Sequence, residues 1–289
     1  MASSPEITRF APSPTGPLHL GHAYAAMVAH DLARASGGRF LIRIEDIDRS
    51  RCRPEWEARI FEDLAWLGLS WDPPVWRQSE RLASYEAALD RLWDQGLLYP
   101  CTCNRRDILA ALDAPQEGVP MGPDGPVYPG TCRHKPRPKI RPTDRALRLN
   151  MAKALPASPL HFHEEGLSSL QGKHPITPKD LIENTGDIVL SRRDMGTSYH
   201  LSVVIDDAAQ GITLVTRGAD LFAATKIHVL LQHLLGLPTP RYHHHRLIRD
   251  EMGKRLAKRD DARALEIYRT EGLAPDAIRQ HLTTGETLG

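Results

Sequence analysis

The chain has 289 residues, of which 41% are hydrophobic, and its 37 basic residues nearly balance 36 acidic ones to a formal charge of +1. This length allows one large domain or two ordinary ones with a substantial core. The near-zero charge excludes indiscriminate electrostatic binding to nucleic acid, although it allows a local basic patch. With no signal-like apolar run and no stretch of ~20 apolar residues, we expect a soluble, cytoplasmic enzyme.

The N-terminal segment predicts a nucleotide-binding turn. A short strand over 7–10 leads, through a turn rich in proline and glycine, into a helix over 21–35. His19 and His22 stand at the start of this helix, where unpaired backbone N–H groups and the helix dipole favour phosphate. Gly21 has no side chain, so an adenine or ribose can lie against its backbone. The alternative is a proline-rich turn with two surface histidines.

A second strand completes a β–α–β unit and ends on an acid. Residues 40–44 read as a buried strand, so the opening belongs to a parallel sheet. Glu45 follows directly, at the edge where open α/β sheets bind ligands, and it is suited to hold an ammonium group. The alternative is a solvated acidic turn, a reading that fits Asp48. Amphipathic helices are predicted over 54–69 and 80–95.

The segment 101–142 is rich in Pro, Gly and Arg and has little periodicity. Such a segment cannot build its own core, and a structural Zn²⁺ would supply the missing cross-link. Cys101, Cys103 and Cys132 offer three thiolates. On chemistry alone His134, two residues past the last cysteine, is the usual fourth ligand. Three reduced cysteines without metal are the alternative.

The second half of the chain is predicted to return to the sheet. We expect a strand over 146–150, irregular structure over 161–186, and then a hairpin over 186–207 that feeds a buried strand ending on two acids. A further strand over 212–216 ends at Arg217. Arg217 is therefore expected on the same rim of the sheet as the acid that ends the first β–α–β unit.

The C-terminal part combines histidines and a basic loop. Side chains of the consecutive histidines 243–245 point in different directions, so we interpret them as surface or adenine-side residues rather than metal ligands. A strand-like stretch over 246–249 precedes a cationic loop over 252–260. Helices over 262–268 and 275–282 close the chain.

Two motifs resemble the ATP signatures of class I aminoacyl-tRNA synthetases, in the form that glutamyl enzymes use. The first is the Pro-Ser-Pro-Thr-Gly run that leads into His19-Leu-Gly-His22. The second is Arg255-Leu-Ala-Lys258-Arg259, which resembles their mobile Lys-Met-Ser-Lys-Ser loop. It departs from that pattern at Arg255 and Ala257, whereas Lys258 keeps the position of the lysine that holds ATP phosphates.

The resemblance implies a fold and a division of the chain. The fold is α/β, a Rossmann-like parallel sheet with a zinc-bearing insertion and a short helical C-terminal region. The first half of the catalytic domain is expected over 1–98 and the second over 181–237, with the zinc-bearing, acceptor-binding-like insertion over 99–180. The mobile ATP loop and the helical region follow over 238–289.

The resemblance also implies the residues of each site. The glutamate pocket would be lined by Arg9, Ala11, Ser13, Glu45, Tyr199 and Arg217. ATP would be bound by Pro12, His19, Gly21, His22 and Lys258. His19, His22 and Lys258, with Mg²⁺, would neutralise charge during the reaction. In the family's Cys-x-Cys…Tyr-x-x-x-Cys pattern the zinc ligands are Cys101, Cys103, Tyr128 and Cys132, so Tyr128 competes with His134 for the fourth place.

Short members of this family activate glutamate without tRNA and attach it to queuosine in the anticodon of tRNA(Asp). The Arg-Gly-Ala-Asp sequence at 217–220 favours them, because full-length glutamyl enzymes usually read Arg-Gly-Glu-Asp there. We therefore expect a monomer that uses glutamate, ATP, Mg²⁺, one Zn²⁺ and the anticodon stem-loop. The rivals are a catalytic fragment that charges the 3′ end of tRNA(Glu), a small-molecule ligase or nucleotidyltransferase, and a tRNA-binding module without catalysis.

Overall fold

A computed structural model describes the chain over residues 4–112, 120–249 and 263–284. Its first layer is a parallel sheet in the order β1-β2-β3, formed by β1 (Ile7–Phe10), β2 (Arg39–Ile44) and β3 (Asp72–Arg77). The connections are α1 (Leu20–Ala35) and α2 (Pro54–Trp66). The β–α–β opening predicted from the sequence is confirmed.

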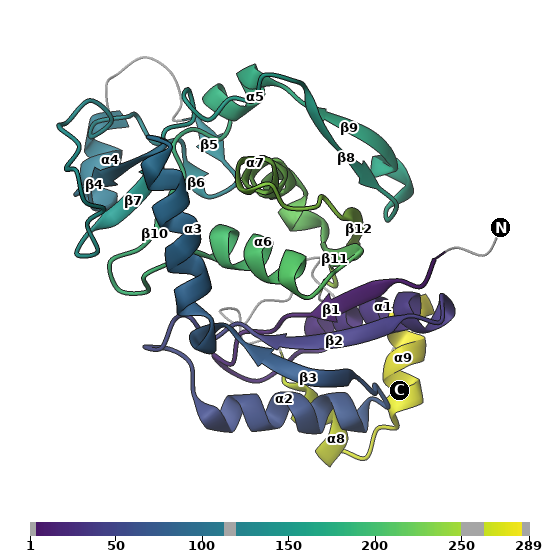
Figure 1. Cartoon of the computed structure of the whole chain (residues 1–289). Coiled ribbons are helices and arrows are strands. Elements are labelled where there is room, and N and C mark those ends of the chain that lie inside the picture. The colour runs from purple at the N-terminus through teal and green to yellow at the C-terminus, as the bar shows by residue number, and fades with distance from the viewer. Residues whose placement is uncertain (1–3, 113–119, 250–262, 285–289) are drawn as a thin grey trace.

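A second sheet continues the first. Its order is β11-β12-β8-β9, and its members are β8 (Leu160–Glu164), β9 (Gly172–Ile176), β11 (Leu214–Gly218) and β12 (Arg241–His245). β11, β12 and β8 run parallel, whereas β9 is antiparallel to β8. The backbone N–H of Thr213, next to β11, donates to the β1 carbonyl of Ile7 at 3.0 Å, and Figure 1 shows β11 beside β1. The carboxyl ends of β1, β2 and β11 therefore face a common region.

The insertion has its own small sheets. An antiparallel sheet in the order β10-β7-β4 contains β4 (Leu98–Cys101), β7 (Ala146–Leu149) and β10 (Val189–Ser191). The other insertion elements are α4 (Arg105–Leu112) and the hairpin of β5 (Met121–Gly122) and β6 (Gly125–Pro126). Three short 3₁₀ turns complete the described elements outside the long helices, at Gln78–Glu80, Ser168–Leu170 and Ala219–Ala224.

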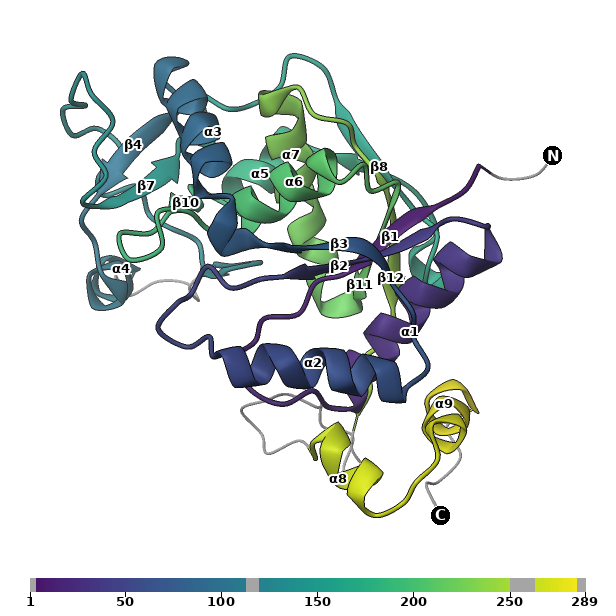
Figure 2. The same cartoon turned by 60° about the horizontal axis from the view of Figure 1, so that its bottom comes forward.

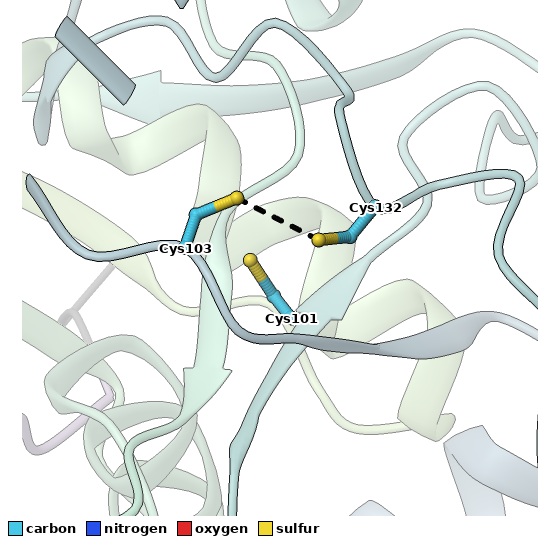
Figure 3. A group of neighbouring side chains, drawn as sticks. All are labelled: Cys101, Cys103 and Cys132. Carbon is cyan, nitrogen blue, oxygen red and sulfur yellow. Dashed lines mark hydrogen bonds between the residues drawn. The ribbon is translucent and has the colours of Figure 1, made fainter. Parts of the chain in front are cut away.

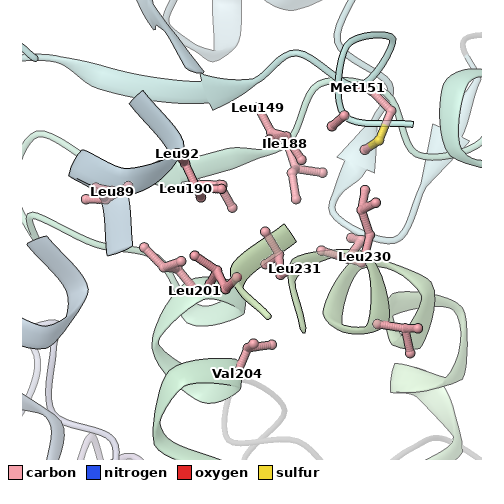
Figure 4. Close-up of a cluster of buried hydrophobic side chains, with 14 of the residues drawn as sticks. Leu89, Leu92, Leu149, Met151, Ile188, Leu190, Leu201, Val204, Leu230 and Leu231 are labelled. Carbon is pink, nitrogen blue, oxygen red and sulfur yellow. The ribbon is translucent and has the colours of Figure 1, made fainter. Parts of the chain in front are cut away.

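One hydrophobic core joins the insertion to the catalytic sheets. It lies among α3 (Leu82–Asp94), α6 (Tyr199–Ala209) and α7 (Thr225–Leu235), with side chains of the insertion on one side. Figure 4 shows leucines of the three helices meeting Leu149, Ile188 and Leu190. Each fully buried side chain of this size contributes about 1.5–3 kcal/mol relative to an exposed one. The insertion is therefore held by apolar packing as well as by its strands.

The C-terminal helices cover the other end of the first sheet. They are α8 (Leu265–Thr270) and α9 (Pro275–Thr284), which lie by α1 and α2 in Figure 2. Their buried Leu265, Ile278 and Leu282 join the core beneath α1 and α2. Among the described residues no helix is both long enough and apolar enough to cross a membrane.

Three sequence predictions are wrong. Residues 199–209 form the helix α6, not a strand. Ser198 caps it by accepting from the Leu201 backbone N–H, and burial in the core outweighs the strand preference of its β-branched residues. The stretch 161–186 is not irregular, since it contains β8, β9 and the helix α5 (Pro178–Glu183). The C-terminal strand lies over the histidines, as β12, and not over 246–249.

Candidate active site and metal centre

The turn between β1 and α1 is organised by its two histidines. His19 is the N-cap of α1, and its Nδ1 accepts from the Gly21 backbone N–H at 3.1 Å. His22 Nδ1 accepts in return from the His19 N–H at 3.2 Å, and the ring centroids lie 3.8 Å apart. Each neutral ring therefore carries its proton on Nε2. A Cβ at position 21 would come within 3.0 Å of the His19 ring, so glycine fits this close approach.

The same turn is tied to the rest of the site. The Glu45 backbone N–H donates to the carbonyl of Pro12 at 2.9 Å, which places the acid beside the turn. From the C-terminal side, Ala264 forms a β-bridge with His19. The predicted phosphate ligand Lys258, with Arg255 and Ala257, lies outside the described residues. The described chain resumes after that loop directly beside the start of α1.

A buried carboxylate gathers two arginines of the parallel sheet. Asp207 of α6 accepts from Arg9 Nε at 2.9 Å and from Arg43 Nη1 at 2.7 Å. Burial opposes ionisation of Asp207, but the two guanidinium groups hold its pKa below the usual range. Arg9 also donates to the Thr216 carbonyl at 2.9 Å, so part of the guanidinium that we predicted to bind substrate is fixed by the protein itself.

The neighbouring acid on α6 anchors a different helix. Asp206 is fully buried and accepts from Tyr85 Oη and Arg81 Nε, both at 2.6 Å. These partners belong to α3 or to the turn before it. Asp206 therefore fastens α3, whereas Asp207 fastens the strands of the sheet.

The predicted glutamate ligands converge around Tyr199. Burial raises the pKa of the Tyr199 hydroxyl. The nearby charges of Arg217 and Arg9 lower this pKa, and the charge of Glu45 raises it. Burial raises the pKa of Glu45 to about 7, since the nearby Arg43 and Arg9 offset only part of the desolvation. The other two predicted ligands, Ala11 and Ser13, lie on the β1–α1 turn, where Ala11 is half-buried and Ser13 is exposed.

Arg217 is buried among uncharged partners. Its Nε donates to His244 Nε2 at 3.0 Å, Nη1 to His228 Nδ1 at 2.8 Å, and Nη2 to Thr225 Oγ1 at 2.6 Å. Burial and the Arg217 charge lower the pKa of His228 well below 6.5, so this ring is neutral. Within the described part of the chain Arg217 forms no ion pair, although only 5% of it is exposed.

These hydrogen bonds extend into a chain of histidines that sequence reasoning missed. Because His228 Nδ1 accepts from Arg217, its Nε2–H donates to His200 Nδ1 at 2.9 Å, and His200 Nε2 then donates to Asp124 at 2.8 Å. On the other side His244 Nδ1 donates to the buried Glu164. Of the histidines 243–245, which we expected at the surface or beside the adenine, His244 is fully buried and His245 is also buried, so neither is a surface residue. No local motif links these residues in the sequence.

The three insertion cysteines lie together. Their sulfur atoms are all within 4.8 Å of one another, and Cys103 Sγ lies 3.6 Å from Cys132 Sγ (Figure 3). Tyr128 Oη lies 3.4 Å from the sulfur atoms of both Cys101 and Cys103. His134, the alternative fourth ligand, is exposed. The structure thus brings one phenolic oxygen and three sulfur atoms to one point, a donor set that could hold a zinc ion.

Charged neighbours suit this cluster to thiolates. The Arg148 guanidinium lies over the Tyr128 ring, 3.8 Å from its centroid, and its Nε donates to Cys101 Sγ at 3.3 Å. Burial opposes ionisation of Cys132, but hydrogen bonds from the Thr102 backbone and the Tyr128 hydroxyl lower the pKa of its thiol to about 6. A thiolate is the form that binds metal.

Comparison with known proteins gives a consistent match. A family model described as "tRNA synthetases class I (E and Q), catalytic domain" matches residues 7–285. A Rhodobacter capsulatus protein named glutamyl-Q tRNA(Asp) synthetase is 64% identical over 276 residues, which cover 95% of this chain and 98% of that protein. A protein of the same name from Symbiobacterium thermophilum is 41% identical and is covered to 84% of its length.

Solved structures show the same fold in longer chains. The glutamate tRNA ligase of Elizabethkingia meningosepticum, solved with its amino acid, superposes with a TM-score of 0.75 at 26% identity. The match covers 97% of this chain, which spans 61% of the length of the ligase. A Mycobacterium tuberculosis methionyl-tRNA synthetase, with a TM-score of 0.64 and 13% identity, shares the fold.

Proposed function

Because the chain belongs to the glutamate and glutamine type of class I tRNA synthetases, we propose that it activates glutamate with ATP and transfers it to queuosine in the anticodon of tRNA(Asp). The relatives most similar in sequence among those described above carry the name glutamyl-Q tRNA(Asp) synthetase. They are matched over most of their length. The longer glutamate tRNA ligases are the source of the alternative, which is charging of the 3′ end of tRNA(Glu).

The buried charge of Arg217 is the observation that carries the choice of glutamate. A buried guanidinium without a carboxylate partner is costly, and an anionic ligand would remove this cost. The γ-carboxylate of glutamate supplies that anion. The neutral amide of glutamine would leave the charge unpaired, so the same geometry rejects glutamine.

The remaining groups of the pocket suit the other end of the amino acid. Glu45, whose pKa is about 7, readily ionises when the substrate ammonium approaches. The Tyr199 hydroxyl is close enough to Glu45 and Arg217 for both charges to affect its pKa. The α-carboxylate is then left to face the β1–α1 turn. That turn carries His19 and His22, whose Nε2–H groups are donors for phosphate oxygens.

Activation is an in-line displacement for which no side chain needs to act as a nucleophile. An oxygen of the glutamate α-carboxylate attacks the α-phosphate of ATP, and the bond from that phosphorus to the oxygen bridging the α- and β-phosphates breaks to release pyrophosphate. The queuosine hydroxyl then attacks the carbonyl of glutamyl-adenylate, loses its proton and releases AMP. The protein contributes position and charge neutralisation, from His19, His22 and Lys258.

The test compares RNA substrates. A queuosine-containing anticodon stem-loop of tRNA(Asp) should accept glutamate from the purified chain, whereas the same stem-loop with guanosine in place of queuosine should not. Intact tRNA(Glu) serves as the substrate of the alternative function. Glutamate found on the 3′-terminal adenosine, with none on the stem-loop, would establish the alternative instead.

We propose in addition that the insertion holds one structural Zn²⁺. Cys101, Cys103 and Cys132 would provide thiolates and Tyr128 the fourth donor, with Arg148 offsetting the negative charge of the site. When bound, the ion would cross-link β4 to the turn that follows Tyr128. The cluster lies in the insertion and takes no part in the displacement at phosphorus.

Replacing Cys103 by serine is expected to lower the zinc content of the untagged protein from about one ion per chain to near zero, because a hydroxyl is a weak zinc ligand. The measurement is elemental analysis after dialysis against metal-free buffer. Cys52, which lies outside the cluster, provides the control: Cys52→Ser should keep its metal. Zinc absent from the unmodified protein would contradict the proposal, and Tyr128→Phe against His134→Ala identifies the fourth ligand.

A further inference from the structure

The buried guanidinium of Arg217 meets its neighbours only as a donor, so each neighbour has to present an acceptor. His228 Nδ1 accepts from Nη1 at 2.8 Å, His244 Nε2 accepts from Nε at 3.0 Å, and Thr225 Oγ1 accepts from Nη2 at 2.6 Å. A neutral imidazole accepts at one nitrogen and donates at the other. Each histidine therefore carries its proton on the far nitrogen, where it needs an acceptor of its own.

These contacts leave part of the guanidinium for a ligand. The described partners take one N–H of Nη1 and one of Nη2. Each terminal nitrogen of a guanidinium carries a second N–H, and this remaining pair suits the oxygens of a carboxylate. Because the guanidinium is planar and rigid, the groups that hold its other N–H bonds also set the direction of the remaining pair.

A carboxylate stands behind each histidine. Behind His244 it is Glu164, buried on β8, which accepts from the far ring nitrogen. Behind His228 the row is one ring longer. His228 Nε2 donates to His200 Nδ1 at 2.9 Å, and His200 Nε2 lies 2.8 and 2.9 Å from the two carboxylate oxygens of Asp124. Each row thus has a group that only donates at one end and a group that only accepts at the other, which fixes the sense of every hydrogen bond.

Asp124 differs from the other members of its row because it belongs to the insertion. It lies in the turn between β5 and β6, whereas the two histidines lie on α6 and α7. Its side chain is 52% exposed, against 6% for His200, so this carboxylate closes the solvent end of the row. Partial burial opposes ionisation of Asp124, but the hydrogen bond with His200 holds its pKa below the usual range. Asp124 is therefore charged at neutral pH.

The two rings of this row also border a second side chain of the pocket. The Tyr199 ring centroid lies 5.3 Å from that of His200 and 5.8 Å from that of His228. The histidines thus pack against one predicted glutamate ligand while His228 accepts a hydrogen bond from the other, Arg217. A displacement of either ring would disturb both.

We propose that Asp124 is a positioning residue of the amino-acid pocket: it holds His200 and His228 in the arrangement that accepts from Arg217, and so directs the remaining N–H pair at the γ-carboxylate of glutamate. The proposal rests on the proposed function, which takes glutamate as the amino acid. The Asp124 charge lies three hydrogen bonds from the guanidinium and offsets part of its buried charge. A carboxylate in direct contact with Arg217 would instead occupy the place of the substrate.

The test is the steady-state kinetics of glutamate-dependent pyrophosphate exchange by the full chain. Asp124→Ala leaves the His200 Nε2–H to water, and the KM for glutamate should rise roughly five- to tenfold, the range for one lost hydrogen bond. Because the row does not reach the β1–α1 turn, kcat and the KM for ATP should stay within about twofold of wild type. Asp124→Asn keeps an acceptor oxygen for His200 and should recover most of the loss in KM. Asp194→Ala, which removes an exposed aspartate outside the row, is the matched control and should keep the wild-type KM.

A spectroscopic measurement tests the row without relying on activity. In ¹⁵N spectra of labelled histidine, wild-type His200 and His228 should each be neutral with the proton on Nε2. The Nε2 proton of His200 should give a resonance in wild type and in Asp124→Asn that Asp124→Ala loses by exchange with water. A wild-type ring with its proton on Nδ1 would overturn the proposal.

The kinetic outcomes separate this role from the proposed function. A glutamate KM of Asp124→Ala within about twofold of wild type would overturn the positioning role, and so would an equal rise in Asp194→Ala. If Asp124→Ala raises the KM as expected but wild type transfers no glutamate to queuosine, the positioning role stands and the proposed function fails. If wild type makes that transfer and Asp124→Ala keeps its KM, the function stands and the positioning role fails.

Discussion

Replacing Lys258 by alanine is expected to lower the rate of glutamate-dependent pyrophosphate exchange about 10²–10³-fold. A fixed cation that opposes charge developing on the ATP phosphates would be lost, and removal of one such group costs roughly 2.7–4 kcal/mol of barrier. The expectation rests on the sequence of the loop and on its position along the chain, because the described chain resumes with Ala264 and Leu265 beside the start of α1.

Lys254→Ala is the matched control, since it removes the same charge from the same loop outside the signature position. It should lower the exchange rate no more than a few-fold. An exchange rate of Lys258→Ala within a factor of two of wild type would remove this lysine from the mechanism. Binding of ATP, measured separately, shows whether the loss lies in the ground state or in the transition state.

Replacing Asp207 by asparagine is expected to lower the free energy of unfolding by about 3–5 kcal/mol, the usual cost of breaking a buried ion pair from one side. Arg9 and Arg43 would lose the carboxylate that both contact, and the asparagine amide would turn a donor toward them. The KM for glutamate should also rise, because Arg9 is no longer held. Urea unfolding and pyrophosphate exchange measure the two effects.

The pH dependence has a defined sign. The pKa of Asp207 is lowered in the folded state, so its stabilising effect is present above its unfolded pKa of about 3.9 and is lost as the pH falls through the folded value. The difference in stability between wild type and Asp207→Asn should therefore narrow below about pH 4. Asp94→Asn, on the exposed side of α3, should change stability by no more than about 0.5 kcal/mol. A loss as small as this in Asp207→Asn would contradict the prediction.

The parts of the site that lie on local motifs could be predicted from the sequence. The strand, turn and helix around His19 and His22 follow one another within about thirty residues, and each has its own signal: an apolar run, a proline-rich turn and a helical period. The spacing of the three insertion cysteines likewise predicts that their sulfur atoms lie together. The structure of such segments is determined mainly by interactions between residues that are close in the sequence.

The supports of the site could not be predicted, because they depend on contacts across the chain. The run of β-branched residues in α6 favours a strand, and only the Ser198 cap and the tertiary core select a helix. That error hid the role of Asp207, which meets Arg9 from a position 198 residues later. Glu164 could not be predicted for the same reason, since its partner His244 becomes a neighbour only when β12 and β8 lie side by side. His228 on α7 likewise meets His200 only when α6 and α7 pack together.

The ion pairs of Asp207 also have a consequence for synthesis on the ribosome. Arg9 and Arg43 emerge early, but their shared counter-ion is translated only after the entire insertion. The first β–α–β unit must therefore leave the exit tunnel with two cations that it cannot yet bury. Until α6 has been made, these two guanidinium groups lack the carboxylate that both contact, and the amino-acid pocket is complete only when β11 follows with Arg217.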